Sequence, residues 1–379
     1  MTAAGERFWE VGLDDTERTI LERGHGDLDT QPDVLVVGGG VMGVATALAC
    51  HKAGLGAVQL VEATALGSGA SGGAAGLLQP EHHHGIDPLC LVDLGRTGLK
   101  RWWELQSSMP NGVGLVANDW IGLAPHPREF VADPPAAAHW LDVDDVVRLV
   151  PDLATPTTGA LIRDQARVNP LRAVAHLAQG LEHIATGVAA TAATVDRGRL
   201  TSVTTSAGTI RPGVTVFATG VPPQVEALNL SLPYDRIKGH LLVTEPAGLR
   251  FEGTVAPVAT RIDDGRLLAG GTLDLDDQSP AVSDDVIEGI HRDLLAAFPD
   301  ATDLAITHRW CCWRPHHPDH LPVIDRLPGV DNAWLTSGHY RTGILMAPAT
   351  ADLLVEWIRT GRRPEAAQPF ALARFGDLR

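Results

Sequence analysis

A glycine-rich turn near residue 40 constrains the fold of this chain more than any other feature. Residues 38–43 read Gly-Gly-Gly-Val-Met-Gly, a G-x-G-x-x-G pattern built on Gly38, Gly40 and Gly43. The turn follows an apolar run at 34–37, which is typical of a buried parallel strand, and opens a helix-like stretch. A second apolar run over 57–61 completes a βαβ unit of about 30 residues. This order predicts a parallel sheet that binds a dinucleotide.

Each part of the turn has a physical reason. The first glycine permits the tight turn, the second lets the backbone approach a pyrophosphate, and the third lets helix and strand pack closely. Free amides at the helix start, including those of Val41 and Met42, favour phosphate charge there. Glu62 ends the second strand, 22 residues after Gly40, where it can accept hydrogen bonds from ribose hydroxyls. An acid at this place favours NAD or FAD over NADP.

Composition narrows the class of protein. The chain has 379 residues, enough for two or three domains, and a formal net charge of −16. This acidic excess argues against a protein that grips nucleic acid or an anionic membrane, and it suits a small-molecule substrate. The four cysteines show neither disulfide nor zinc spacing, and we expect no metal site. Because the sequence shows no secretion signal and no apolar run long enough to span a membrane, we expect a cytoplasmic protein. The sequence leaves the oligomeric state open, and a homo-oligomer is possible.

A buried strand followed by glycine recurs near residues 34, 214 and 333, with other material between. This predicts an α/β protein: a Rossmann-type dinucleotide-binding domain with an inserted antiparallel-sheet α+β substrate domain. We assign 32–118, 158–232 and 305–362 to the first domain and 119–157 and 233–304 to the second, with an N-terminal appendage (1–31) and a C-terminal tail (363–379). Helices are expected at 14–22, 41–52, 98–105, 142–149, 169–184, 283–298 and 345–358. Further strands are expected at 118–123, 188–195, 200–206, 213–218, 237–244, 266–272 and 333–337.

Small residues dominate the stretch 66–78, Leu-Gly-Ser-Gly-Ala-Ser-Gly-Gly-Ala-Ala-Gly-Leu-Leu. Such a composition also suits a flexible linker. The run nevertheless resembles the segment of the glycine oxidase/D-amino acid oxidase/sarcosine oxidase family that covers the FAD pyrophosphate and lines the flavin ring. The family often has a basic–polar pair where this chain has Gly73 and Ala74. The resemblance implies that FAD contacts Ser68, Ala70, Ser71, Ala75, Gly76 and Leu77.

Other stretches between about 33 and 360 extend the resemblance. The strand and turn at 214–220 resemble the family's segment beside the dinucleotide, which implies roles for Thr219 and Gly220. The stretch 164–172, which contains Val168, resembles the segment that supports the adenosine side. Residues 313–325 are similar to the family's R-P-x-T-P-D-x-x-P-x-I segment, and 338–349 are similar to the glycine oxidase signature. The chain therefore resembles glycine oxidase most within this family.

The C-terminal stretch carries the predicted chemistry. The family's arginine for the substrate carboxylate corresponds to Arg314, and Arg341 occupies the arginine position of the signature. Arginine stays charged and holds a carboxylate through two parallel hydrogen bonds. His339 and Tyr340 are candidates for the pocket wall. The helix start near the flavin is predicted to involve Gly338, Thr342, Gly343, Ile344 and Leu345, whose free amides can stabilise negative charge on the reduced ring.

Cysteine and histidine leave two alternatives open. Cys312 stands where some sarcosine oxidase relatives link a cysteine to the flavin by a thioether, whereas glycine oxidases bind FAD non-covalently. We expect non-covalent FAD and keep the link to Cys312 as the alternative. The adjacent histidines at 82–84 point in divergent directions and lack metal-ligand spacing, so we predict no ligand role for them.

The resemblance implies oxidation of a small amino acid or N-substituted glycine-type amine. Hydride would pass from the carbon α to the carboxylate to flavin N5, the imine would hydrolyse to an oxo acid such as glyoxylate, and O2 would reoxidise the flavin to give H2O2. Two departures point to an altered amine: the pocket tyrosine of glycine oxidases is replaced near Pro257 or Val258, and no lysine occurs at 266–270. Lys238 is the nearest, in a segment that resembles a family turn. The alternatives are a dehydrogenase with another electron acceptor, a flavin-binding module without turnover, and an NAD dehydrogenase.

Overall fold

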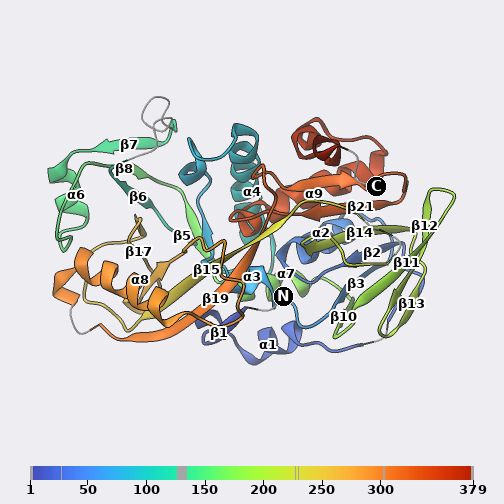
Figure 1. Cartoon of the computed structure of the whole chain (residues 1–379), viewed down its shortest axis with the longest axis horizontal. Coiled ribbons are helices and arrows are strands. Elements are labelled where there is room, and N and C mark those ends of the chain that lie inside the picture. Colours follow the sequence, from blue (N-terminus) through green and yellow to red (C-terminus); the bar gives the residue numbers. More distant parts are fainter. Residues whose placement is uncertain are drawn as a thin grey trace.

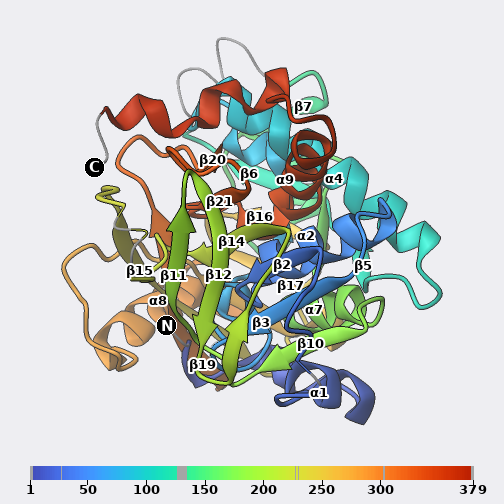
Figure 2. The ribbon, with the colours of Figure 1, turned by 90° about the vertical axis from the view of Figure 1, so that its right-hand side faces the viewer.

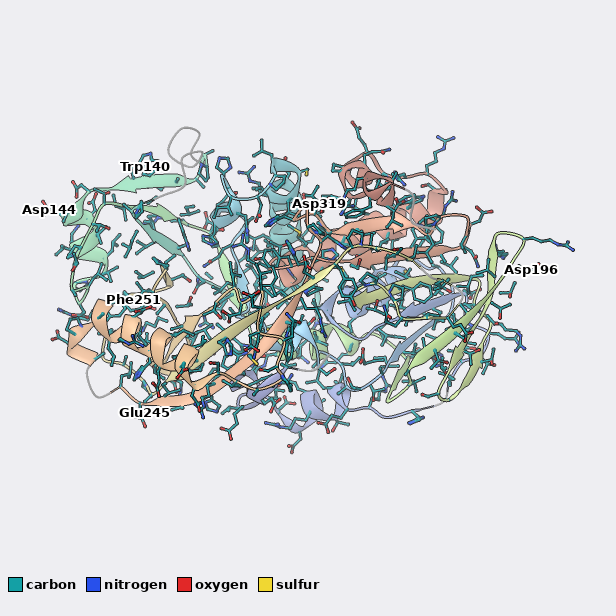
Figure 3. All side chains as sticks on the ribbon, in the orientation of Figure 1. Trp140, Asp144, Asp196, Glu245, Phe251 and Asp319 are labelled. Atoms are coloured by element: carbon teal, nitrogen blue, oxygen red, sulfur yellow. The ribbon has the colours of Figure 1, made fainter. Side chains whose placement is uncertain are left out.

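Two large sheets lie side by side in the computed structural model of the chain (Figure 1), which describes residues 3–26, 28–125, 135–226, 228, 230–301 and 304–376. One sheet has six strands and the other nine. Asp144 and Asp196 mark the two ends of the long axis, one in each half of the molecule (Figure 3). The arrangement confirms the predicted α/β class with a second, mainly antiparallel sheet.

The six-stranded sheet contains the predicted βαβ unit. Its strands pair in parallel except at the β20–β21 edge, which is antiparallel. In spatial order they are β10 (His183–Thr186), β3 (Val58–Glu62), β2 (Val34–Val37), β14 (Val214–Gly220), β21 (Ala333–Ser337) and β20 (Val323–Arg326). Strands from three distant parts of the sequence thus form one sheet, as the recurring strand-plus-glycine pattern predicted.

Each face of this sheet is covered by a different layer. Val34 and Val36 pack with the helices, whereas Leu35 and Val37 pack with a three-stranded meander. The helices are α2 (Val41–Lys52), α4 (Leu89–Ser108), α7 (Pro170–Ala178) and α9 (Gly343–Thr360). The meander consists of β11 (Ala190–Asp196), β12 (Arg199–Thr205) and β13 (Gly208–Ile210), and it lies in front of the sheet in Figure 2. Strand β2 is therefore buried on both sides, which explains the unbroken apolar run at residues 34–37.

The nine-stranded sheet forms the other half of the molecule. Its strands, in spatial order, are β1 (Ala4–Glu6), β19 (Ile306–His316), β15 (Asp235–Thr244), β18 (Leu267–Gly270), β17 (Ala259–Arg261), β16 (Thr254–Ala256), β6 (Trp120–Leu123), β8 (Gly159–Ile162) and β7 (Ala138–Leu141). The helices α6 (Val143–Leu149) and α8 (Asp284–Ala297) pack around its apolar core. A small sheet of β4 (Leu77–Leu78), β9 (Ala166–Val168) and β5 (Leu115–Ala117) adjoins the short helix α3 (Ala70–Gly73).

Residues 3–26, expected as an appendage, are integrated into this fold. Strand β1 pairs antiparallel with β19, and the short 3-10 turn η1 (Phe8–Glu10) brings Trp9 into the core. Helix α1 (Asp15–Leu21) follows, and it begins with a capping box between Asp14 and Glu17.

Most predicted elements are present, with some differences. The helix predicted over 169–184 is wrong at its end, because α7 stops at Ala178 and 183–186 form strand β10. The stretch predicted as a helix at 98–105 is the middle of the longer α4. Strands β8 and β19, assigned by the sequence to the dinucleotide-binding domain, belong to the nine-stranded sheet.

Candidate active site

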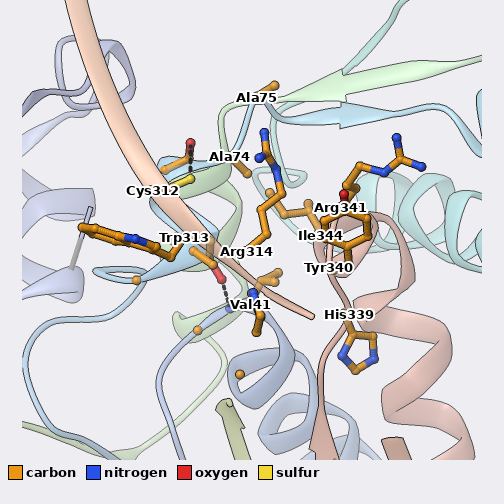
Figure 4. A pocket seen from close by; sticks show the side chains of 18 of the residues that line it. Val41, Ala74, Ala75, Cys312, Trp313, Arg314, His339, Tyr340, Arg341 and Ile344 are labelled. Atoms are coloured by element: carbon orange, nitrogen blue, oxygen red, sulfur yellow. Dashed lines mark hydrogen bonds between the residues drawn. The ribbon is translucent and has the colours of Figure 1, made fainter. Parts of the chain in front are cut away.

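A cavity of about 740 Å³ lies where the two sheets meet (Figure 4). Its size is that of small-molecule and cofactor sites in general. One end is lined by the β2–α2 turn, and we call it the glycine end; it includes Gly38, Gly40 and Glu62. The other is lined by Arg314 and Arg341, and we call it the arginine end.

At the glycine end the main chain is packed too tightly for side chains. Gly38 has φ +114°, and a Cβ there would overlap the Ala218 carbonyl. A Cβ on Gly43 would overlap the Gly38 carbonyl, so this glycine lets α2 approach β2 as the motif predicts. Helix α2 starts at Val41 with no side-chain cap, and Val41 N donates to Ser71 Oγ at 3.0 Å. The positive end of the helix dipole therefore faces the cavity.

Glu62 links the turn to the second strand. Its carboxylate accepts hydrogen bonds from Gly39 N at 2.6 Å and from Thr64 N at 2.9 Å, and the residue lines the cavity. Thr219 and Gly220, at the end of β14, line the same end. Glu62, the residue predicted to bind the ribose hydroxyls, is therefore held in place by two amides of the main chain.

The small-residue segment forms one wall of the cavity. Six of its predicted residues line the cavity: Ser68, Ala70, Ser71, Ala75, Gly76 and Leu77. Gly76 has φ +76°, and a Cβ there would overlap the Val168 carbonyl, whose own amide donates to Gly76 O at 2.9 Å. Val168 thus supports the wall from outside the lining. The segment is a built wall and not a flexible linker.

Strand β19 supplies the next wall. Cys312 and Arg314 leave it on one side and Trp313 on the other, as the period of two in a strand requires (Figure 4). Burial raises the pKa of the Cys312 thiol, and its Sγ donates to Gly73 O at 3.2 Å. A Cβ on Gly73 would overlap the Cys312 side chain. The missing basic–polar pair is thus explained at position 73, because only glycine fits beside β19.

Arg314 is a partly buried cation that has no carboxylate partner among the described residues. Its Nη1 donates to the Thr272 carbonyl at 2.7 Å, and its guanidinium lies against the α-carbon of Gly239, where a Cβ would overlap it. Burial lowers the pKa of Arg314, but the guanidinium group of an arginine keeps its charge in proteins. Over the described ranges, no carboxylate lies within ion-pair distance of this guanidinium.

Arg341 is in a different state. Its Nη2 donates to Asp87 Oδ2 at 3.2 Å, and its guanidinium lies 5.2 Å from the Tyr340 ring. Asp87 is also hydrogen-bonded to His83 Nδ1 at 2.7 Å. Burial raises the pKa of Asp87, but His83 and Arg341 outweigh it and the net shift is downward. Arg341 therefore already has a carboxylate partner.

His339 and Tyr340 line the cavity between β21 and α9. Burial, together with the nearby His317, lowers the pKa of His339 to about 3, so its ring is neutral at neutral pH. Tyr340 has φ +47°, a conformation that costs energy for a tyrosine and is often found at functional sites. Helix α9 then starts with no side-chain cap, and Gly343 and Ile344 face the cavity. A second helix start thus points into the site.

Four predicted site residues do not line the cavity and lie behind its wall: Gly43 in α2, and Gly338, Thr342 and Leu345 near the start of α9. Gly338 is needed because a Cβ would overlap the His317 ring. Thr342 Oγ1 donates to His339 O at 2.9 Å, and Leu345 packs on Gly95 of α4. These four residues therefore support the wall from behind.

Sequence reasoning missed part of the arginine end. His82 and His83 line the cavity, together with Gln79, Trp120, Thr254 and Thr260. Burial first, and then His83 and Arg341, lower the pKa of His82 to about 4. In the sequence, only the histidine triplet pointed to this part of the cavity. The surroundings of His82 come from distant residues: its ring lies 5.4 Å from that of Trp120, and Arg341 helps to lower its pKa. In the described part of the chain, no group of three histidines, cysteines and acids could hold a metal ion.

The substrate-domain strands also face the cavity. Pro257 and Val258, the positions matched to the family tyrosine, line it, as do residues 268–271. Lys238 does not: it lies in strand β15 rather than in a turn, and its Nζ donates to Asp277 Oδ2 and Ala281 O, both at 2.6 Å. The strand predicted over 237–244 is therefore confirmed.

Comparison with known proteins decides the family. The family model described as "FAD dependent oxidoreductase" matches residues 33–357. The chain belongs to this family. It is 28% identical to glycine oxidase of Pseudomonas aeruginosa, over 87% of this chain and 95% of that protein. A D-amino acid dehydrogenase of Chromohalobacter salexigens is 33% identical over 46% of this chain and 43% of its own.

Solved structures agree on the fold. The crystal structure of glycine oxidase from Geobacillus kaustophilus superposes with a TM-score of 0.79 at 24% identity, covering 91% of this chain and 99% of that one. The cofactor is FAD, and the cavity fits it: two uncapped helix starts, α2 and α9, face a wall of small residues. The protein is an FAD-dependent amino acid or amine oxidoreductase of the glycine oxidase type. Among the described residues, no helix is long and apolar enough to cross a membrane.

Proposed function

We propose that this protein oxidises a small amino acid or an N-substituted glycine, whose carboxylate binds to Arg314. One observation carries the proposal: Arg314 is charged, partly buried and on the cavity wall, and it has no carboxylate partner in the described part of the chain. A buried charge without a counter-charge is costly, so an anionic substrate stabilises this site on binding. The planar guanidinium fits a carboxylate through two parallel hydrogen bonds.

The remaining residues of the arginine end orient the substrate and exclude water. His82 and His339 are neutral at neutral pH, so they add hydrogen-bonding atoms without adding charge. Trp120 and Leu241 form apolar wall and limit the size of the amine. The chemistry that bound FAD would supply is acceptance of a hydride from the carbon next to the carboxylate and transfer of the electrons to O2, which would give H2O2 and an imine that hydrolyses to an oxo acid.

We also propose that FAD is bound without a covalent link. The Cys312 thiol donates to the Gly73 carbonyl, and its raised pKa keeps it out of the reactive thiolate form. Precipitation with acid should therefore leave the yellow cofactor in the supernatant. Flavin that stays with the protein pellet would show the thioether at Cys312 instead.

Matched ligand pairs test the proposed substrate class. Glycine and sarcosine should bleach the flavin absorption of the holoenzyme under anaerobic conditions, whereas methylamine and dimethylamine, which lack the carboxylate, should not. Air should restore the spectrum with one H2O2 per flavin reduced. Equal bleaching by the amines without a carboxylate would remove Arg314 from the proposal, and no bleaching by any small amine would favour a flavin-binding module without turnover.

A dehydrogenase is the second candidate. Lys238, the lysine nearest to where sarcosine oxidases carry their oxygen-activating lysine, is bound to Asp277 and does not line the cavity. One partial relative is named a D-amino acid dehydrogenase. If this candidate is right, bleached enzyme will recover with a quinone analogue but not with air.

A further inference from the structure

The N-terminal segment, residues 3–21, contacts the cofactor wall although it precedes the family match at 33–357. Strand β1 adds to the nine-stranded sheet beside β19, opposite Cys311 and Trp310. Ala3 N also donates to Ser68 O at 3.0 Å, directly behind a residue of the wall. This part of the chain therefore lies on the outer side of the FAD site.

Two indole groups hold consecutive carbonyls of that wall. Trp9 Nε1 donates to Ala74 O at 2.8 Å, and Trp310 Nε1 donates to Gly73 O at 2.9 Å. Both tryptophans are buried, and their rings meet edge to face at 6.3 Å. One donor comes from the N-terminal segment and the other from β19, so the wall is held from two directions.

These bonds set the orientation of the peptide groups. Because the carbonyls of Gly73 and Ala74 point out toward the indoles, the peptide planes there cannot rotate freely. Ala74, Ala75 and Gly76 line the cavity. Within the described ranges, the Ala75 amide donates to no protein acceptor. The inner edge of the wall is thus left to face the cofactor.

The N-terminal segment is anchored on both sides of Trp9. Upstream, β1 is paired with β19. Downstream, Asn169 Nδ2 donates to Trp9 O at 2.9 Å, and Glu17 of α1 accepts from Arg172 Nε at 2.7 Å. His176 Nε2 lies 2.9 Å from the same Glu17 carboxylate. Trp9 is therefore fixed between two attached elements.

The wall is also shaped to accept this segment. A Cβ on Gly73 would lie 3.2 Å from the Ala3 side chain, besides overlapping Cys312. A Cβ on Gly72 would lie 2.8 Å from Arg7 Nη1. The departure from the family's basic–polar pair at Gly73 and Ala74 thus coincides with contacts from residues outside the family match.

We propose that the N-terminal segment is part of the FAD site and that Trp9 is a positioning residue, which holds the Ala74 carbonyl so that 73–76 keep the conformation that binds the flavin. The inference goes beyond the proposed function, because it holds for any amine and any electron acceptor.

Replacing the donor while keeping a ring tests this. Trp9→Phe removes the indole N–H, which is worth about one ordinary hydrogen bond, so the dissociation constant of FAD should rise about fivefold. The constant is measured by titrating the apoprotein with FAD and following flavin fluorescence. Trp310→Phe should shift it in the same direction. The matched control is Trp334→Phe, because the indole N–H of this buried tryptophan has no hydrogen-bond partner among the residues that the structure describes.

An unchanged dissociation constant in Trp9→Phe, or an equal rise in Trp334→Phe, would overturn the proposal. Hydrogen exchange on the unaltered protein gives an independent readout. If the N-terminal segment and FAD are coupled, FAD must stabilise that segment in return. Amides at 3–12 should exchange more slowly with FAD than without it, while those of α8 should not change. Slower exchange at 38–43 without any change at 3–12 would contradict the coupling.

Discussion

At the glycine end of the cavity the surface is mostly main chain, whereas at the arginine end it is side chains. The glycine end comes mainly from one continuous stretch, β2 to β3, followed closely by the wall at 66–77, and the end of β14 joins it from elsewhere in the sequence. The arginine end joins Arg314 on β19, Arg341 after β21 and the histidines before α4. The glycine end is therefore formed mainly by residues that are close in the sequence, whereas the arginine end is formed by residues that are far apart in it.

The comparison shows how each end should fail. A main-chain surface works because atoms are absent, so an added methyl group damages it. A side-chain surface works because a particular group is present and held in place, so removal or displacement damages it. The arginine end contains two arginines in different states: Arg341 is paired with Asp87, whereas Arg314 has no carboxylate partner in the described part of the chain. Substitutions at each end can separate these cases.

The largest effect is expected from removing the free cation. Arg314→Ala should lower kcat/KM for the amino acid by about 10³-fold, or about 4 kcal/mol, because truncating one partner of a buried charge pair costs several kcal/mol. The flavin absorption spectrum and the FAD content should stay unchanged. Steady-state kinetics and the spectrum of purified enzyme measure both.

Arg341→Ala is the matched control for that variant. Because Asp87 already neutralises this arginine, its loss should lower kcat/KM only about tenfold. A loss as large as that of Arg314→Ala would mean that Arg341 leaves Asp87 to bind the substrate. The comparison of the two arginines would then be wrong.

At the glycine end an added methyl group should weaken FAD binding. Gly43→Ala places a Cβ on the Gly38 carbonyl, so α2 must move away from β2, and the FAD dissociation constant should rise about 100-fold, or about 3 kcal/mol. Gly289→Ala in α8 is the control, since the nearest atom to its Cβ is 3.9 Å away. It should leave FAD binding unchanged and stabilise the helix by about 0.5–1 kcal/mol. Equal FAD affinity in the two variants would contradict the close-packing role of Gly43.

The same difference explains what could be predicted from the sequence. The glycine end is local, so strand, turn, helix and Glu62 could all be predicted from adjacent residues. Asp87, which is also hydrogen-bonded to His83, is separated from its partner Arg341 by 254 positions, and no local pattern reveals this pairing. The wall at 66–78 was predicted through its resemblance, but its contact with Trp9 was not.

Two further misses have the same cause. The sequence predicted a helix as far as residue 184 because Leu177, Leu181 and Ile184 have a helical spacing. Ile184 instead pairs with Leu60 of β3, and main-chain hydrogen bonds to that distant strand stabilise β10. The N-terminal segment looked like an appendage because its composition is polar. Its strand finds a partner in β19, about 300 positions away, which composition cannot show.

The position of Arg314 can be tested without touching its charge. Gly239→Ala places a Cβ on the guanidinium, which must swing away from the Thr272 carbonyl. KM for the amino acid should rise about tenfold, since a displaced fork keeps its charge but loses its geometry. In an Arg314→Ala background the same substitution should have no further effect on KM, which a double-mutant cycle measures. Additive effects in the cycle would show that Gly239 acts on something other than Arg314.

The smallest effect concerns pH. Burial, with nearby His317, lowers the pKa of His339 to about 3, below the value of about 6.5 in an unfolded chain. Between these values only the unfolded chain binds the proton, so the free energy of unfolding should fall as pH drops below 6.5, by at most about 1.4 kcal/mol per pH unit for this histidine. His339→Asn cannot titrate, so urea unfolding at pH 7.5, 6.5, 5.5 and 4.5 should show a shallower decline for this variant than for the parent. Parallel declines would mean that His339 takes up its proton in the folded protein over the same pH range as in the unfolded chain. Below that range the arginine end would then carry a further positive charge beside its two arginines.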